Sequence, residues 1–108
     1  MIYELRIYHA VPGRLADVHH NFEHVTLPLW ERHGIVAPGF FTTLIGPTNQ
    51  SLTYLLKWTS LAERESKMAA FAKDPDWIRH RAAAEANGVL VARIESSFLT
   101  PTSYSAMQ

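Results

Sequence analysis

The sequence predicts an α+β fold, a sandwich of strands and helices in the order β-α-β-β-α-β. Three observations predict it: an alternating strand at the start, two segments of helical character, and a hairpin between them. This order is typical of the ferredoxin-like fold, in which four antiparallel strands lie in the order 4-1-3-2 with both helices on one face. The 108 residues suffice for one domain over residues 1–108, and no internal repeat divides them.

The first strand covers residues 2–9, and its side chains alternate between two faces. One face carries Tyr3, Leu5 and Ile7. The other carries Glu4, Arg6 and Tyr8. We expect the first of these faces, which is apolar, to be covered by the helices. The second holds an acid, a base and a phenol in a row, so it is exposed to water, paired with a neighbour or part of a cavity.

The first helix is predicted over residues 14–33, after a turn at Pro12-Gly13. Apolar side chains recur along it at helical spacing. Pro28 lies late in this helix and is expected to kink or break its last turns, because proline cannot donate the backbone hydrogen bond. Gly34 follows the helix as its C-terminal glycine.

The second strand is predicted over residues 35–45, with a bulge or a late start at Pro38-Gly39. Residues 46–50 form a turn, and residues 51–58 form the third strand. The second helix opens with a capping box at Ser60 and Glu63.

The second helix runs to about residue 73 and restarts at Asp74-Pro75, with the aspartate as cap. It ends near Asn87-Gly88, and the fourth strand covers residues 89–99.

A partner is predicted to cover the sheet face that the helices leave open. On the third strand Tyr54 and its apolar neighbours share one face, while Leu55 lies on the other, so both faces need cover. In the predicted arrangement Glu4 and Arg6 lie beside Glu95 and Arg93 on the fourth strand. These charges form either a ladder exposed to water or a ladder buried under a second subunit. We expect a homodimer through the face of Glu4, Arg6 and Tyr8, with Arg6 the arginine most important for stability. Its two sheets would enclose a cavity lined by Arg6, Tyr8, Tyr54 and Glu95.

Composition excludes several classes of function. Ten basic and ten acidic residues balance, which argues against nucleic acid and against a polybasic membrane patch. The absence of cysteine excludes disulfides and thiol chemistry. No apolar run approaches the roughly 20 residues of a membrane span. The chain opens on a strand and leaves no room for a signal peptide, so we expect a cytoplasmic protein.

Several short motifs, in order and spacing, resemble the NIPSNAP family of the dimeric α/β-barrel superfamily. They are residues 2–6 with Tyr8, Pro12-Gly13, residues 27–29, His33-Gly34, Gly39-Phe40, and residues 46–50, 60–64 and 101–105. The family typically has a histidine and then a tryptophan in the third strand, where this chain has Tyr54 and Leu56. The resemblance implies the fold above and no settled activity. Related barrels include cofactor-free monooxygenases, dismutases and haem-binding enzymes.

The candidate site is the group of polar residues expected on the open sheet face. It is a ligand-binding set of Glu4, Arg6, Tyr8, Tyr54, Arg93 and Glu95. Tyr8, Tyr54 and Glu95 are the catalytic candidates, since a phenol can hydrogen-bond a substrate oxygen and an unpaired carboxylate can act as a base. Arg6 or Arg93 would hold a carboxylate or an enolate. An alternative interpretation is that the charges only pair with one another.

No metal site or cofactor is predicted. His20 and His24 have the spacing of two ligands on a helix but no converging third ligand. His80 is expected on a polar helix surface without a role, and Trp30, Trp58 and Trp77 are expected to pack in the core. The residues favour a small-molecule enzyme: an isomerase, a decarboxylase or a cofactor-free oxygenase acting on a phenolic or enolisable substrate. The alternative is a non-catalytic ligand-binding or protein-interaction module.

Overall fold

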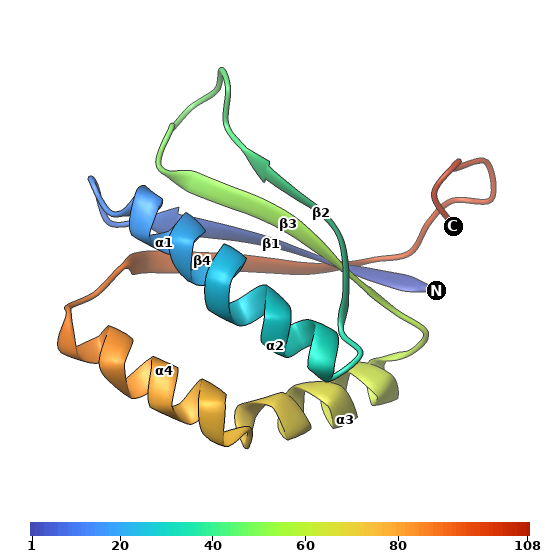
Figure 1. Ribbon diagram of the computed structural model, residues 1–108. Helices are drawn as coiled ribbons and strands as arrows, with labels where there is room; N and C mark the ends of the chain where they lie inside the picture. The colour runs from blue at the N-terminus through green and yellow to red at the C-terminus, as the bar shows by residue number, and fades with distance from the viewer.

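The chain forms one four-stranded antiparallel sheet with the helices on one of its faces, as the computed structural model shows (Figure 1). The structure describes residues 1–108 apart from the side chain of Glu85. The elements are β1 (Ile2–Ala10), α1 (Leu15–Asn21), the π-helix η1 (Phe22–Thr26), α2 (Leu27–Arg32), β2 (Val36–Thr42), β3 (Ser51–Trp58), α3 (Leu61–Ala72), α4 (Pro75–Ala86) and β4 (Val91–Leu99). The strand order is β2-β3-β1-β4, which confirms the predicted order 4-1-3-2.

The two faces of β1 are the reverse of the prediction. Arg6 pairs with Tyr54, and Tyr54 is fully buried beneath the helices. Because directly opposite residues of an antiparallel pair share a face, Glu4, Arg6 and Tyr8 lie on the helix side. The long apolar stripe of β3 sets which face is buried, and it brings the polar row of β1 inside with it.

The open face therefore carries the other row of β1. Leu5 pairs with Leu55 of β3 and Ile7 pairs with Glu95 of β4. Ile94 and Phe98 of β4 pair with Tyr8 and Glu4, which puts them on the helix side. The predicted ladder of Glu4 and Arg6 with Glu95 and Arg93 is wrong, because the two pairs lie on opposite faces of the sheet.

The first helix is continuous but contains one widened turn. The backbone N–H of Leu27 donates to the carbonyl of Phe22, five residues earlier, as in a π-helix. Pro28 follows at once, and its ring would clash with the carbonyl four residues earlier in a regular α-helix. The wider turn before the proline relieves that clash, so the predicted break is a π-helical segment. Gly34 ends the helix with a φ of 68°, a left-handed conformation that suits glycine.

Three further local predictions are confirmed, whereas β2 ends at Thr42 and β4 begins at Val91, short of the predicted ranges 35–45 and 89–99. The register of β2 against β3 shifts between Val36 and Gly39, as the Pro38-Gly39 pair indicated. At the start of α3 the N–H of Glu63 donates to Ser60 Oγ over 3.1 Å, and Glu63 Oε1 accepts from the N–H of Thr59 over 3.0 Å. The helix layer breaks between α3 and α4, where Asp74 caps α4.

Asp74 also joins the two parts of the helix layer. Its Oδ2 lies 2.7 Å from His33 Nε2 and accepts from Arg32 Nη1 over 3.1 Å. The hydrogen bond to His33, with Arg32 beside it, holds the pKa of Asp74 below its ordinary value. The end of α2 is thereby tied to the junction of α3 and α4, which fixes the position of α4 against the sheet.

Candidate functional site

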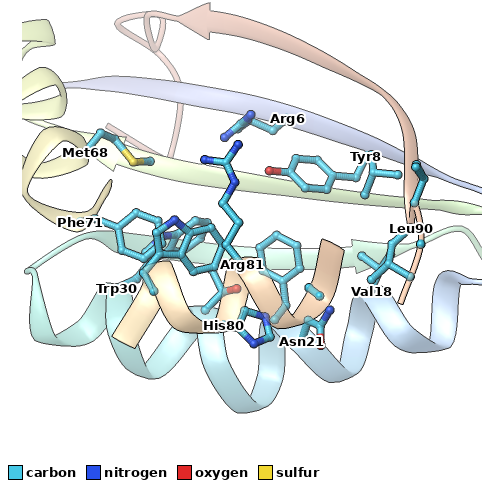
Figure 2. A pocket seen from close by; sticks show the side chains of 17 residues that line it. Arg6, Tyr8, Val18, Asn21, Trp30, Met68, Phe71, His80, Arg81 and Leu90 are labelled. Carbon is cyan, nitrogen blue, oxygen red and sulfur yellow. The ribbon is translucent and has the colours of Figure 1, made fainter. Parts of the chain in front are cut away.

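The helix layer and the sheet enclose a pocket of about 740 Å³ within a single chain. Its wall comprises Arg6, Tyr8, Val18, Asn21, Phe22, Thr26, Trp30, Met68, Phe71, Trp77, His80, Arg81, Ala84, Gly88, Val89, Leu90 and Val91. Figure 2 shows these side chains between β1 and the helices. The volume lies in the range of about 300–1,000 Å³ that is typical of small-molecule sites. Arg6 and Tyr8, which were predicted to line a cavity between two sheets, therefore line one between the sheet and the helices of the same chain.

Aromatic packing builds one wall of the pocket. Phe22 of η1 lies edge-on to Tyr8, with ring centroids 5.5 Å apart, and Trp30 of α2 lies 5.7 Å from Phe22. Trp30 is 3% exposed, so its indole is held in place from several sides. The prediction that Trp30 packs in the core is confirmed, and the same residue also lines the pocket.

Two arginines from different layers reach the pocket. Arg6 extends from β1, and its guanidinium carbon lies 5.2 Å from the centre of the Tyr8 ring. Arg81 extends from α4, and Figure 2 shows its guanidinium pointing toward the side of the pocket where Arg6 and the Tyr8 hydroxyl lie. The sheet and the helix layer therefore each present a cation to the same space.

Glu4 is occupied by structural contacts and does not line the pocket. Its carboxylate accepts from Arg64 through Nε over 2.9 Å and Nη2 over 3.2 Å. The indole N–H of Trp58 donates to the same carboxylate over 3.1 Å. Arg6 Nε lies 3.9 Å from it. With 1% of its surface exposed and both oxygens engaged, Glu4 cannot act as a base, and its role is to anchor α3 to the sheet.

Tyr54 lies behind Tyr8 in the wall between sheet and helices. Its ring stacks on Phe40 with centroids 5.0 Å apart and lies 5.5 Å from that of Tyr8. Burial and the neighbouring Tyr8 phenol raise the pKa of Tyr54 above its ordinary value, despite the nearby Arg6 guanidinium. Tyr54 therefore stays a neutral phenol, and its buried hydroxyl has no hydrogen-bond partner.

Arg93 and Glu95 lie on the open face, away from the pocket. Glu95 Oε2 is 2.5 Å from His9 Nε2. The hydrogen bond to His9, with Arg93 nearby, lowers the pKa of Glu95. An ionised, paired carboxylate on the opposite face does not suit the catalytic role that we assigned to Glu95. Of the six predicted ligand-binding residues, the structure brings Arg6 and Tyr8 into the pocket and Tyr54 next to it.

Sequence reasoning missed the contribution of α4 to the site. His80 was expected on a polar helix surface without a role, but it lines the pocket together with Arg81. The helix is polar on most of its surface, and three consecutive alanines follow Arg81. The alanines were the available signal, because small side chains on a helix leave space beside the sheet that a pocket can occupy.

The described part of the chain holds no group of three or more metal-ligating side chains. The rings of His20 and His24 lie 4.5 Å apart on the surface of the first helix, and Glu23 Oε2 lies 3.9 Å from His24 Nε2 without completing such a group. Among the described side chains that line the pocket there is no carboxylate, and His80 is the one imidazole.

The fold and the site define a class: an α+β protein of the ferredoxin-like type with a pocket between its sheet and its helices. A model of the NIPSNAP family matches residues 3–106. The chain belongs to the NIPSNAP family, as its motifs suggested. No match was found among curated proteins.

Solved structures of similar proteins agree with this assignment. An Agrobacterium tumefaciens protein superposes with a TM-score of 0.88 at 23% identity, over 100% of both chains. A NIPSNAP family protein of the same organism gives 0.88 at 22% identity, over 99% of this chain and 98% of the other. An uncharacterized NIPSNAP-like domain protein of Burkholderia xenovorans superposes with a TM-score of 0.83 at 26% identity, over 96% of this chain and 87% of the other. None of the described helices has the length and hydropathy needed to cross a membrane.

Proposed function

We propose that this protein binds a small molecule in the pocket between sheet and helices and acts on it as an enzyme of the dimeric-barrel type. The substrate is phenolic or enolisable, and the reaction is an isomerisation, a decarboxylation or a cofactor-free oxygenation. One observation carries the proposal: a pocket of about 740 Å³ whose largely apolar wall holds a few convergent polar groups.

The polar groups of the pocket suit chemistry at an enolisable carbon. His80 takes the proton from the enolisable carbon as general base, since the described part of the lining offers no carboxylate for that step. Arg6, with the Tyr8 hydroxyl beside it, stabilises the negative charge that develops on the substrate oxygen. Phe22 and Trp30 form an aromatic wall beside these groups, against which an apolar part of the substrate can pack.

The test of binding uses N-phenyl-1-naphthylamine, a neutral aromatic dye whose fluorescence rises in an apolar site. The wild type is expected to bind it at about one molecule per chain. Ala84→Trp places a large side chain in the pocket and is expected to abolish binding, whereas Ala69→Trp, at an exposed position of α3, retains it. Failure of the wild type to bind, or unchanged binding by Ala84→Trp, would overturn the proposal.

Catalysis is tested with phenylpyruvate, an enolisable aromatic keto acid. The wild type is expected to accelerate its tautomerisation, and His80→Gln to lower that rate by about 10²-fold, the usual contribution of a general base. Binding without turnover would favour the alternative, a non-catalytic ligand-binding module.

We also propose that the protein is a homodimer through the open face of the sheet. Leu5, Ile7 and Leu55 lie on that face in the middle of the sheet, and Leu99 at its margin is 43% exposed. These apolar side chains are only partly buried within the chain, and a second copy of the chain would cover them. The face differs from the one we predicted, because Glu4, Arg6 and Tyr8 lie under the helices of their own chain.

Sedimentation velocity tests the dimer. The wild type is expected to be dimeric at micromolar concentration, with an interface of more than about 1,000 Å². Leu55→Arg puts a charge in the interface and is expected to give a folded monomer. Leu61→Arg, on the helix side, serves as the matched control and stays dimeric, since its side chain is already 58% exposed there. A monomeric wild type would contradict the proposal.

A further inference from the structure

We infer that the substrate of the pocket is an elongated molecule, whose reacting group carries an apolar extension. The extension lies in the aromatic end of the pocket, which is formed by Trp30, Met68, Phe71 and Trp77. The inference rests on the proposed function and goes further, because it assigns the length of the substrate and the direction in which it lies. It also gives Met68 and Trp77 a role in selecting substrates by length.

Two helical segments run in opposite directions along the pocket. Asp74, at the start of α4, contacts His33, at the end of the first helix, over 2.7 Å. Arg14, just before α1, donates to the backbone carbonyl of Asn87, just after α4, over 3.4 Å. Between these two contacts α4 packs against η1. The pocket is therefore a trough that follows the axes of both helices.

The lining residues show the length of this trough. On the first helix they extend from Val18 to Trp30, which at about 1.5 Å per residue corresponds to roughly 18 Å. On α4 they extend from Trp77 to Ala84, or about 10 Å of helix. A single ring with a short side chain would fill only part of such a space, whereas an elongated molecule would fill it.

Burial distinguishes the two ends of the trough. At the aromatic end Trp30 is 3% exposed and Phe71 7%, with ring centroids 6.2 Å apart, and Trp77 lies 4.6 Å from Phe71. At the opposite end Val89 is 69% exposed. An apolar group gains most where it is removed from water completely. The aromatic end is therefore the place for the apolar part of the substrate.

The groups assigned to the chemistry lie beside the aromatic end. Figure 2 shows Arg6 and Tyr8 between Met68 at one end of the view and Leu90 at the other. On α4, His80 lies about one helical turn beyond the aromatic end. A substrate held by these groups can therefore extend an apolar substituent into the aromatic end.

A series of 4-alkylphenols with ethyl, butyl, hexyl and octyl chains tests the inference by isothermal titration calorimetry. For the wild type the affinity is expected to rise from ethyl to hexyl by about fourfold per added methylene, the gain for a buried CH₂ group. Met68→Trp fills the aromatic end. It is expected to abolish this rise while leaving the affinity for 4-ethylphenol unchanged.

Ala69→Trp is the matched control, because it adds the same side chain at the neighbouring, exposed position of α3. It should keep the full rise from ethyl to hexyl. Trp77→Leu provides an arm with the opposite effect, because it enlarges the aromatic end. It is expected to bind 4-octylphenol more tightly than the wild type does, so the test stays decisive if Met68→Trp does not fold.

The outcomes separate the inference from the proposed function. A wild type whose affinity does not rise from ethyl to hexyl would overturn the inference, while binding of N-phenyl-1-naphthylamine would still support the proposed function. A rise as large in Met68→Trp as in Ala69→Trp, or no tighter binding of 4-octylphenol by Trp77→Leu, would also overturn it. A wild type that binds neither the dye nor any alkylphenol would overturn both.

Discussion

Arg64→Met is expected to lower the free energy of unfolding by about 3 kcal/mol, the lower end of the cost of breaking a buried ion pair. Arg64 donates two hydrogen bonds to Glu4, whose side chain is 1% exposed. Without Arg64 the carboxylate stays buried with only the Trp58 indole and a distant Arg6 to stabilise it. We expect the lower end because Arg64 itself is 34% exposed and Arg6 lies 3.9 Å from the carboxylate.

Urea denaturation at pH 7 measures this effect. Arg79→Met is the control, and a change of less than about 0.5 kcal/mol is expected at that exposed position. Combining Arg64→Met with Glu4→Met should recover most of the lost stability, because the penalty belongs to the unpaired carboxylate. A double variant no more stable than Arg64→Met would contradict this account. We therefore expect the loss of Arg64, and not of Arg6 as predicted from the sequence, to lower the stability more than the loss of any other arginine.

Tyr54→Ala is expected to lower the free energy of unfolding by about 3–5 kcal/mol, as for other large-to-small changes of a fully buried aromatic residue. Tyr54 is 0% exposed and its ring contacts Phe40, Phe22 and Trp30. Its removal would leave a cavity at the centre of the helix-covered face. Tyr104→Ala, at a position 89% exposed, is the control and should change stability by less than about 0.5 kcal/mol.

Tyr54→Phe separates the ring from the hydroxyl. The hydroxyl has no hydrogen-bond partner, so its removal breaks no bond and ends the cost of burying an unpaired polar group. Stability equal to or above that of the wild type is expected in the same denaturation series. A loss of more than about 1 kcal/mol in Tyr54→Phe would show that the hydroxyl does have a partner in the folded protein.

Most of the fold was predictable because its signals are local. The Ser60 and Asp74 caps, the Pro38-Gly39 bulge and the strand 51–58 each depend on a few neighbouring residues. The burial of β1 is different, because alternation defines two faces without deciding which one is covered. Counting apolar residues favoured Tyr3, Leu5 and Ile7, but Glu4 is buried by an arginine 60 positions later in the sequence. Such a long-range partner cannot be found from the pattern of one strand.

The candidate site was predictable only in part for the same reason. Arg6, Tyr8 and Tyr54 were identified by their residue types, and their place in the pocket depended on the face of β1. His80 and Arg81 lie on a helix without a clear apolar stripe, so the face that it turns toward the sheet could not be derived from its sequence.

The π-helical turn has a consequence for the geometry of the pocket. Val18, Phe22, Thr26 and Trp30 all line it, at intervals of four residues. In an uninterrupted α-helix of 3.6 residues per turn, three such intervals would drift by about 120° around the axis. The extra residue of η1 offsets most of this drift and keeps the four side chains in a row. Deleting one residue between 22 and 26 would let the segment run as a regular α-helix, in which Val18 and Trp30 are eleven steps apart and lie only about 20° apart around the axis, so both would still face the pocket.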